Sequence, residues 1–189
     1  MRAFVAIPLP GGFADWLRTC RATFALAVPS IRLVPAASCH ITLRFLGELP
    51  GEQVGDAAAR LSLSLSGVSG TSVVLDRFGV FRRDGHPAVL WAGPSVTSQA
   101  LTGLAATIDC SLSGLGSNGR VERFAPHVTL GRFAPGTRDD EAAAIQAGPA
   151  EPFVVPVTDI VLYESIMGQG HPVYIARASV RLAPSYCIM

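Results

Sequence analysis

The sequence predicts an α+β fold in which two similar lobes, each an antiparallel sheet with helices on its outer face, enclose a cleft. Three observations predict it. The pattern His-x-Thr-Leu occurs twice, at His40 and at His127. Each copy lies in a β-rich run, and each is followed by a helix and then by two extended runs. We therefore expect one bilobal, pseudo-twofold domain over residues 1–189, with approximate halves 1–94 and 95–189 that can exchange strands.

The first half of the chain reads as β-α-β-α-β-β, with a short extended piece at 31–35. Runs of β-branched and aromatic residues indicate strands, apolar residues at helical spacing indicate helices, and Pro- or Gly-rich stretches separate them. The expected strands are 2–9, 39–47, 71–81 and 88–93, and the expected helices are 12–27 and 53–66.

The second half of the chain reads as α-β-α-β-β. Its first helix has Ser95 as the candidate N-cap, and its second helix carries acidic residues in the first turn, where the helix dipole favours them. The expected helices are 95–115 and 138–148, and the expected strands are 123–134, 152–165 and 172–182. This order matches the elements that follow the first motif.

Charge and apolar content exclude several classes of protein. With 15 basic and 14 acidic residues the formal charge is +1, so no global field draws the chain to long nucleic acid or to an anionic membrane. The N-terminal apolar run ends at Pro8, which is too short for a signal-peptide core or a membrane span. The four cysteines show no CxxC spacing. We expect a cytoplasmic monomer that recognises phosphate only locally.

The first motif is expected to place its polar residues on one face of a strand. Successive side chains of a strand point to opposite faces. The polar face then holds His40, Thr42 and Arg44, and the apolar face holds Ile41, Leu43 and Phe45.

The second motif follows the same alternation, with His127 and Thr129 on one face. Strict alternation points Arg132 away from His127, and a bulge or strand end near Gly131 would be needed to turn it inward. From the sequence, both orientations of Arg132 stay open.

Two histidines on facing strands fit acid–base chemistry at phosphorus. Histidine titrates near pH 6.5 when unperturbed, so at neutral pH one imidazole can accept a proton while the other donates one. In-line displacement at phosphorus needs both, because water is deprotonated on one side while the leaving oxygen is protonated on the other. The hydroxyls of Thr42 and Thr129 can donate hydrogen bonds to the non-bridging oxygens. This chemistry requires no metal and no other cofactor.

Three other interpretations of the motif fit less well. A lone histidine in a half-buried strand is more often structural, but two copies in matching lobes favour a paired function. A zinc site needs a third and a fourth ligand, and neither motif supplies nearby Cys or acidic partners. A nucleophilic triad lacks a nucleophile elbow, and Cys39 should point to the face opposite His40.

The ordered set of segments resembles the 2H phosphoesterase superfamily, and within it the bacterial and archaeal RNA 2′,3′-cyclic phosphodiesterases once called 2′-5′ RNA ligases. The segments are RAFVAIPLP, HITLRFLGE, RFAPHVTLGRF and LYES followed by Gly170 and Tyr174. The resemblance implies the bilobal fold and metal-independent hydrolysis of an RNA 2′,3′-cyclic phosphate to a 2′-phosphomonoester. It implies His40 as proton donor to the leaving 3′ oxygen and His127 as proton acceptor from water.

The resemblance also implies roles for residues around the histidines. Thr42 and Thr129 carry over as ligands of phosphate oxygens, and Arg132 matches the arginine that closes the second motif and contacts substrate phosphate. Arg44, at a position where the family often has lysine, is a further candidate phosphate ligand. Phe45 matches an aromatic of the family, and we expect it to pack in the core.

The implied substrates are RNA 3′ ends or small nucleotides that carry a 2′,3′-cyclic phosphate. Two alternatives remain at this point. The chain could be a module that binds RNA ends or nucleotides without physiological turnover, or 2′-5′ RNA ligation could accompany hydrolysis as a side activity.

Overall fold

The computed structural model describes residues 1–117, 124–148, 150–168 and 172–184. Gly170, one of the residues that carry the resemblance, lies outside these ranges. The described helices are α1 (Phe13–Ala27), α2 (Gln53–Ser64), α3 (Gln99–Ser111) and α4 (Asp139–Ala147), with a 3-10 turn η1 (Ala36–Ser38). The described strands are β1 (Arg2–Pro8), β2 (Arg32–Leu33), β3 (His40–Glu48), β4 (Thr71–Leu75), β5 (Arg77–Arg83), β6 (His86–Gly93), β7 (Val128–Arg132), β8 (Phe153–Val157), β9 (Asp159–Met167) and β10 (Pro172–Arg181).

The strands pair antiparallel throughout the named elements. The main sheet has the order β10-β9-β1-β3-β7-β6-β5, with β2 beside β7, and β4 pairs with β8 in a separate two-stranded sheet. The predicted α+β class with antiparallel strands is therefore confirmed. No helix among the described residues combines the length and the apolar character that a membrane span requires.

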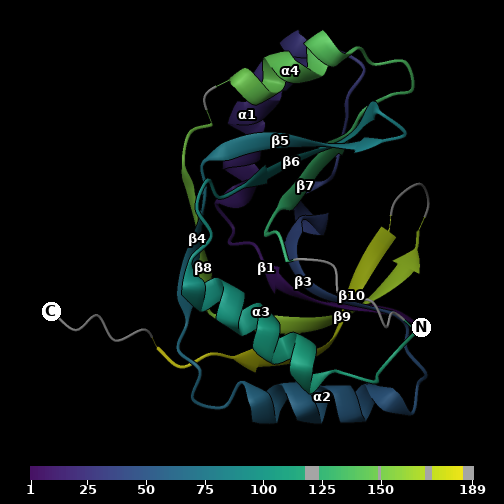
Figure 1. Ribbon diagram of the computed structural model, residues 1–189, viewed down its shortest axis with the longest axis vertical. Helices are drawn as coiled ribbons and strands as arrows, with labels where there is room; N and C mark the ends of the chain where they lie inside the picture. The colour runs from purple at the N-terminus through teal and green to yellow at the C-terminus, as the bar shows by residue number, and fades with distance from the viewer. Residues whose placement is uncertain (118–123, 149, 169–171, 185–189) are drawn as a thin grey trace, which may run out of the picture.

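The main sheet has two parts that meet at one residue pair. β10, β9, β1 and β3 form one part, beside α2 and α3, while β7, β6 and β5 form the other, beside α1 and α4 (Figure 1). The parts join where Ile41 of β3 pairs with Val128 of β7. Each part contains strands from both halves of the chain, because β1 and β3 lie next to β9, and β7 lies next to β6.

The core fills the space between the sheet and the helices. Apolar residues on one stripe of α1 are buried, as helical spacing requires, and the central strands β1 and β3 bury Val5, Ile7 and Ile41 completely. The indole of Trp16 on α1 donates a hydrogen bond to the carbonyl of Glu151 at 2.8 Å, which satisfies its polar atom inside the core. The polar motif residues therefore lie on the face of the sheet opposite this core.

Three predicted elements needed correction. The runs 71–81 and 152–165, each predicted as one strand, break into two strands at Asp76 and Thr158. The carboxylate of Asp76 accepts hydrogen bonds from the N–H and the hydroxyl of Ser95, both at 2.6 Å. Ser95 is thereby engaged with Asp76, and the predicted N-cap is wrong: Ser98 caps α3, with its hydroxyl accepting from the N–H of Leu101 at 3.2 Å.

Candidate active site

The two His-x-Thr motifs meet at the junction of the two sheet parts. Ile41 and Val128, the residues between His and Thr in each motif, pair across the junction and are both fully buried. Continuing this antiparallel register by one residue each way sets His40 across from Thr129 and Thr42 across from His127. Cross-strand neighbours share a face, and the diagonal neighbours His40 and His127 are then about 7–8 Å apart at the backbone. That spacing leaves room for a phosphoryl group between the two imidazoles.

Both motif strands carry a β-bulge at the leucine of His-x-Thr-Leu. Along β3, Val5 pairs with Arg44 and Ala6 pairs with Thr42, so Leu43 is the extra residue. Along β7, Leu90 pairs with Gly131 and Trp91 pairs with Thr129, so Leu130 is the extra residue. A bulge reverses the alternation of side chains beyond it. In both strands two consecutive residues are buried at that point.

The bulge in β7 turns Arg132 toward the histidines. Arg132 is exposed and falls on the same face as Thr129, which decides between the two orientations that the sequence left open. Burial raises the pKa of Tyr174 on β10, and the positive charge of Arg132 opposes that rise.

The bulge in β3 makes the predicted faces of Arg44 and Phe45 wrong. Arg44 is only 9% exposed and forms an ion pair with Asp109 of α3 on the helix-covered side, which removes it from the phosphate-binding candidates. Burial lowers the pKa of the Arg44 guanidinium. Phe45, expected in the core, is 58% exposed and lies on the face of His40. Phe45 thus occupies in motif one the position that Arg132 occupies in motif two.

Each histidine is held by the same backbone contact. Nδ1 of His40 lies 3.0 Å from the carbonyl oxygen of Ser38, and Nδ1 of His127 lies 2.8 Å from the carbonyl oxygen of Ala125. A carbonyl oxygen only accepts, so in both rings Nδ1 carries the proton of the hydrogen bond. Nε2 is the nitrogen left for a substrate, and over the described residues no hydrogen bond uses Nε2 of either ring.

His40 lies within an aromatic cluster on its sheet part. Its ring stacks on Phe4 at a centroid distance of 4.7 Å, and Phe4 stacks in turn on Tyr163 at 5.4 Å. Tyr174 meets both His40 and Phe4 edge-on at 5.0 Å. Burial lowers the pKa of His40, the carbonyl of Ser38 counteracts this, and the positive charge of His127 lowers the pKa further.

His127 has different neighbours on the other sheet part. Phe81 of β5 meets its ring edge-on at 4.8 Å, and Trp91 of β6 lies 6.4 Å away. A Cβ on Gly79 would come within 2.0 Å of the Trp91 indole, so the glycine provides the space in which this indole lies across β5. Arg77 places its guanidinium over the indole at 5.2 Å.

The threonines complete the set around the histidines. Thr42 and Thr129 are half-buried on the motif face, which is the face of the sheet that carries His40. Among the described residues no hydrogen bond engages either hydroxyl, so both can donate to a ligand. The same residues contain no group of three or more His, Cys, Asp or Glu side chains that could hold a metal ion. Cys39, next to His40, is buried, and burial raises the pKa of its thiol to about 12, which makes it a poor nucleophile.

Sequence reasoning missed the aromatic residues around the two rings. Tyr163 and Tyr174 are half-buried beside His40. Phe4 and Phe81 belong to no sequence motif that would have marked them as site residues. A usable signal exists for Tyr163 and Tyr174 only, because polar-tipped aromatics in otherwise apolar strands require a partner or solvent at the hydroxyl. Of the other histidines, His86 is exposed at the start of β6 and His171 lies outside the described residues.

Comparisons with known proteins find similar sequences and a similar fold. The family model of the 2′-5′ RNA ligase superfamily matches residues 10–168. The RNA 2′,3′-cyclic phosphodiesterase of Methanocaldococcus jannaschii is 31% identical over 132 residues, which are 70% of this chain and 71% of that protein. The protein of the same name from Escherichia coli K12 is 29% identical over 92% of both chains. The crystal structure of E. coli LigT complexed with 3′-AMP superposes with a TM-score of 0.76 at 27% identity, covering 96% of this chain and 97% of that one.

Proposed function

The chain belongs to the 2′-5′ RNA ligase superfamily, and from this premise we propose that it hydrolyses the 2′,3′-cyclic phosphate at an RNA 3′ end to a 2′-phosphomonoester. It is a phosphodiesterase, as its named relatives are. The observation that carries the proposal is the matched pair of imidazoles. Each is anchored through Nδ1 to a carbonyl two residues earlier, which leaves two Nε2 atoms free at one junction of the sheet.

In the proposed reaction the cyclic phosphate lies between the two Nε2 atoms. His127 accepts a proton from water as the water oxygen forms a bond to phosphorus, and the bond from phosphorus to the 3′ oxygen breaks. His40 donates its Nε2 proton to that leaving oxygen, so the product is a 2′-phosphate with a free 3′-hydroxyl. Proton transfer by two placed groups lowers the barrier without a metal ion.

Thr42, Thr129 and Arg132 stabilise the phosphoryl oxygens in this proposal. Hydroxyl donors on both sides of the junction and one guanidinium match the negative charge that spreads over the non-bridging oxygens during the displacement. Because these donors are fixed on strands, they need no reorganisation at the moment of reaction.

The pKa of His40 bears on the assignment of acid and base. Burial lowers it in the free protein, which disfavours the protonated form that an acid needs. A bound phosphodiester carries a negative charge next to the ring, and this charge favours the protonated imidazole. His40 therefore gains its proton as substrate binds, which fits the donor role taken from the family.

A single experiment tests the proposed function. An RNA oligonucleotide ending in 2′,3′-cyclic phosphate is incubated with the protein in EDTA, and the regiochemistry of the product is determined. Turnover to the 2′-phosphate in EDTA supports the proposal. Turnover that EDTA abolishes and a divalent ion restores contradicts the metal-independent mechanism. Tight binding of the oligonucleotide without turnover indicates a binding module, and joining to an added 5′-hydroxyl oligonucleotide measures the ligase reaction.

A further inference from the structure

Arg32 has no part in the reaction described above, whereas Arg132, directly opposite it in the sheet, contacts the reacting phosphate there. We propose that Arg32, which lies beside Arg132, binds the phosphodiester that precedes the cyclic phosphate along the RNA, so that the chain prefers RNA ends to cyclic mononucleotides. This inference rests on the proposed function and adds a specificity-determining residue, Arg32, to it.

Arg32 and Arg132 are directly opposite each other in the sheet. Arg32 of β2 pairs with Arg132 of β7 in antiparallel register, which brings their Cβ atoms to about 4.5–5.5 Å. Like charges at such positions destabilise a sheet unless another charge compensates them. Over residues 1–117, 124–148, 150–168 and 172–184, neither guanidinium forms an ion pair with a carboxylate. Both side chains are exposed, so an anion from solution can reach them.

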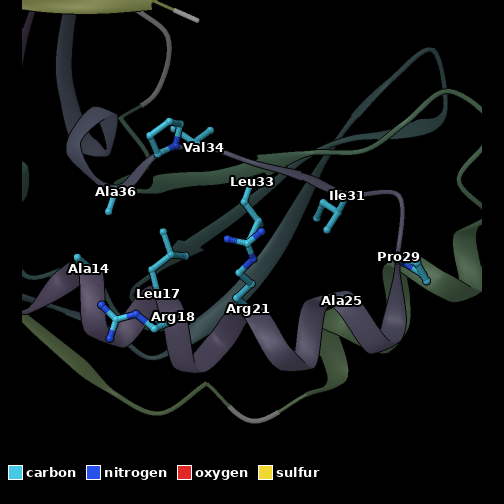
Figure 2. Close-up of a pocket in the computed structure, with 11 residues that line it drawn as sticks. Ala14, Leu17, Arg18, Arg21, Ala25, Pro29, Ile31, Leu33, Val34 and Ala36 are labelled. Atoms are coloured by element: carbon cyan, nitrogen blue, oxygen red, sulfur yellow. The ribbon is translucent and has the colours of Figure 1, made fainter.

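The neighbours of Arg32 fix the face on which it lies. Ile31 and Leu33 line a groove of about 460 Å³ against α1, and Figure 2 shows both side chains pointing toward that helix. Arg32, between them, points to the opposite side of the strand. This is the side of Arg132, which the bulge at Leu130 places with Thr129.

Gly131 lets β2 come close enough to form this pair. A Cβ at Gly131 would lie 3.0 Å from the carbonyl oxygen of Arg32 and 3.1 Å from the side chain of Leu33, so a larger residue would push β2 away from β7. The small residue Gly131 therefore directly precedes Arg132 in the sequence. The close approach is what sets Arg32 and Arg132 opposite each other across the two strands.

The distance from the reacting phosphate fits a neighbouring nucleotide. Arg132 is three residues beyond Thr129 on β7, which is about 7–10 Å along a strand that rises about 3.3 Å per residue. A phosphate one nucleotide from the cyclic group falls within the reach of Arg32, which lies opposite Arg132 at this position. A guanidinium group binds phosphate oxygens through two parallel hydrogen bonds. Because the net charge of the chain is only +1, the local charge of two neighbouring arginines attracts phosphate more strongly than the charge of the whole protein does.

The test compares two substrates that differ by one adenosine and the phosphodiester that joins it. We would measure kcat/KM for adenosine 2′,3′-cyclic phosphate and for the dinucleotide ApA ending in the same cyclic phosphate, with the unmodified chain, Arg32→Gln and Arg32→Lys. Arg21→Gln is the matched control, because Arg21 lies on α1 in the groove on the other side of β2. We expect Arg32→Gln to lower kcat/KM about 5- to 20-fold for the dinucleotide and less than about 2-fold for the mononucleotide. Arg32→Lys should fall between, and Arg21→Gln should change neither.

Salt dependence and binding give readouts that do not rely on turnover. Loss of one phosphate contact should reduce the slope of log Kd against log salt by about 0.7 for the dinucleotide product ending in 2′-phosphate. Equal effects of Arg32→Gln on both substrates and both products, or no effect on either, would overturn the second phosphate site and leave the proposed function intact. If the unmodified chain hydrolyses neither substrate, the proposed function fails, and the binding measurements still decide the role of Arg32.

Discussion

The two motif strands share a backbone design but differ at the residues that follow the bulge. Both β3 and β7 place His and Thr on the motif face, bulge at leucine, and anchor the imidazole to a carbonyl two residues earlier. In β3 the next two residues are Arg44, paired to α3, and Phe45, exposed; in β7 they are Gly131, packed against β2, and Arg132, exposed.

The comparison shows which parts of the repeat carry chemistry and which carry specificity. The repeated part, His-x-Thr-Leu with its bulge, sets four polar side chains around one residue pair. The part that differs gives the β3 side an aromatic surface and the β7 side a cationic one. An RNA end presents both a base, which stacks on aromatic rings, and phosphates, which bind arginine, so the asymmetry fits a ligand with direction.

The largest expected effect tests the equivalence of the two histidines. His40→Ala and His127→Ala should each lower kcat by about 10²- to 10⁴-fold on the oligonucleotide with a cyclic phosphate, because each removes one proton-transfer group. His86→Ala, at an exposed position on β6, is the control and should retain full activity. If either motif variant keeps more than a tenth of the activity, the two motifs are not a catalytic pair.

The next effect concerns the residue that follows the bulge in β3. Arg44→Met should lower the free energy of unfolding by about 2–4 kcal/mol, because it leaves the carboxylate of Asp109 without its ion-pair partner at a mostly buried site. Replacing both residues, as Arg44→Met with Asp109→Leu, should recover most of that loss. Urea denaturation of the three proteins measures it. A double variant as unstable as Arg44→Met would show that the ion pair is not the source of the cost.

A smaller effect separates the exposed residues that close the two motifs. Arg132→Gln should lower kcat/KM by about 10- to 100-fold on the oligonucleotide, since it removes a charge-assisted contact to phosphate. Phe45→Leu should change it less than about 3-fold, because leucine keeps an apolar side chain beside Phe4. Steady-state kinetics of both variants provide the comparison. Equal losses would mean that the asymmetry between the motifs has no role in catalysis.

The smallest effect is a displacement of the pH–rate profile. The pKa of His40 is lowered in the free protein, so if His40 is the acid, the alkaline limb of kcat/KM should lie below pH 6.5, where the free protein loses that proton. The limb of kcat should lie at higher pH, since bound phosphate favours the protonated ring. Rates from about pH 4.5 to 8.5 test this. If instead the acid limb of kcat/KM, and not the alkaline limb, reports a pKa below 6.5, His40 is the base.

Much of the fold was predictable from the sequence because long periodic runs and turn residues are local signals. The breaks at Asp76 and Thr158 were not, because β-rich residues flank both positions and the break at Asp76 depends on a distant partner, Ser95. The cap of α3 failed for the same reason: Ser95 is a good N-cap by type, but its hydroxyl is already bonded to Asp76, and Ser98 takes the role.

The site was predictable where its residues precede the bulges and not beyond them. Strict alternation predicts His40, Thr42, His127 and Thr129 on one face, and the pairing of the buried residues Ile41 and Val128 is consistent with that prediction. It failed at Arg44 and Phe45 because a bulge depends on how the neighbouring strand packs, and a leucine that follows threonine carries no local sign of one. For Arg132 the condition stated from the sequence, a bulge near Gly131, is met at Leu130.

The interleaving of strands from the two halves of the chain has a consequence for folding. The pairing of β1 with β9 joins segments separated by most of the chain, and the pairing of β3 with β7 joins segments separated by nearly half of it. Closing such long loops costs entropy before the contacts repay it, which slows folding and makes the transition cooperative. We expect neither half to assemble the complete site when it is synthesised alone. The surroundings of His40 are complete only when the last strands, β9 and β10, join the sheet.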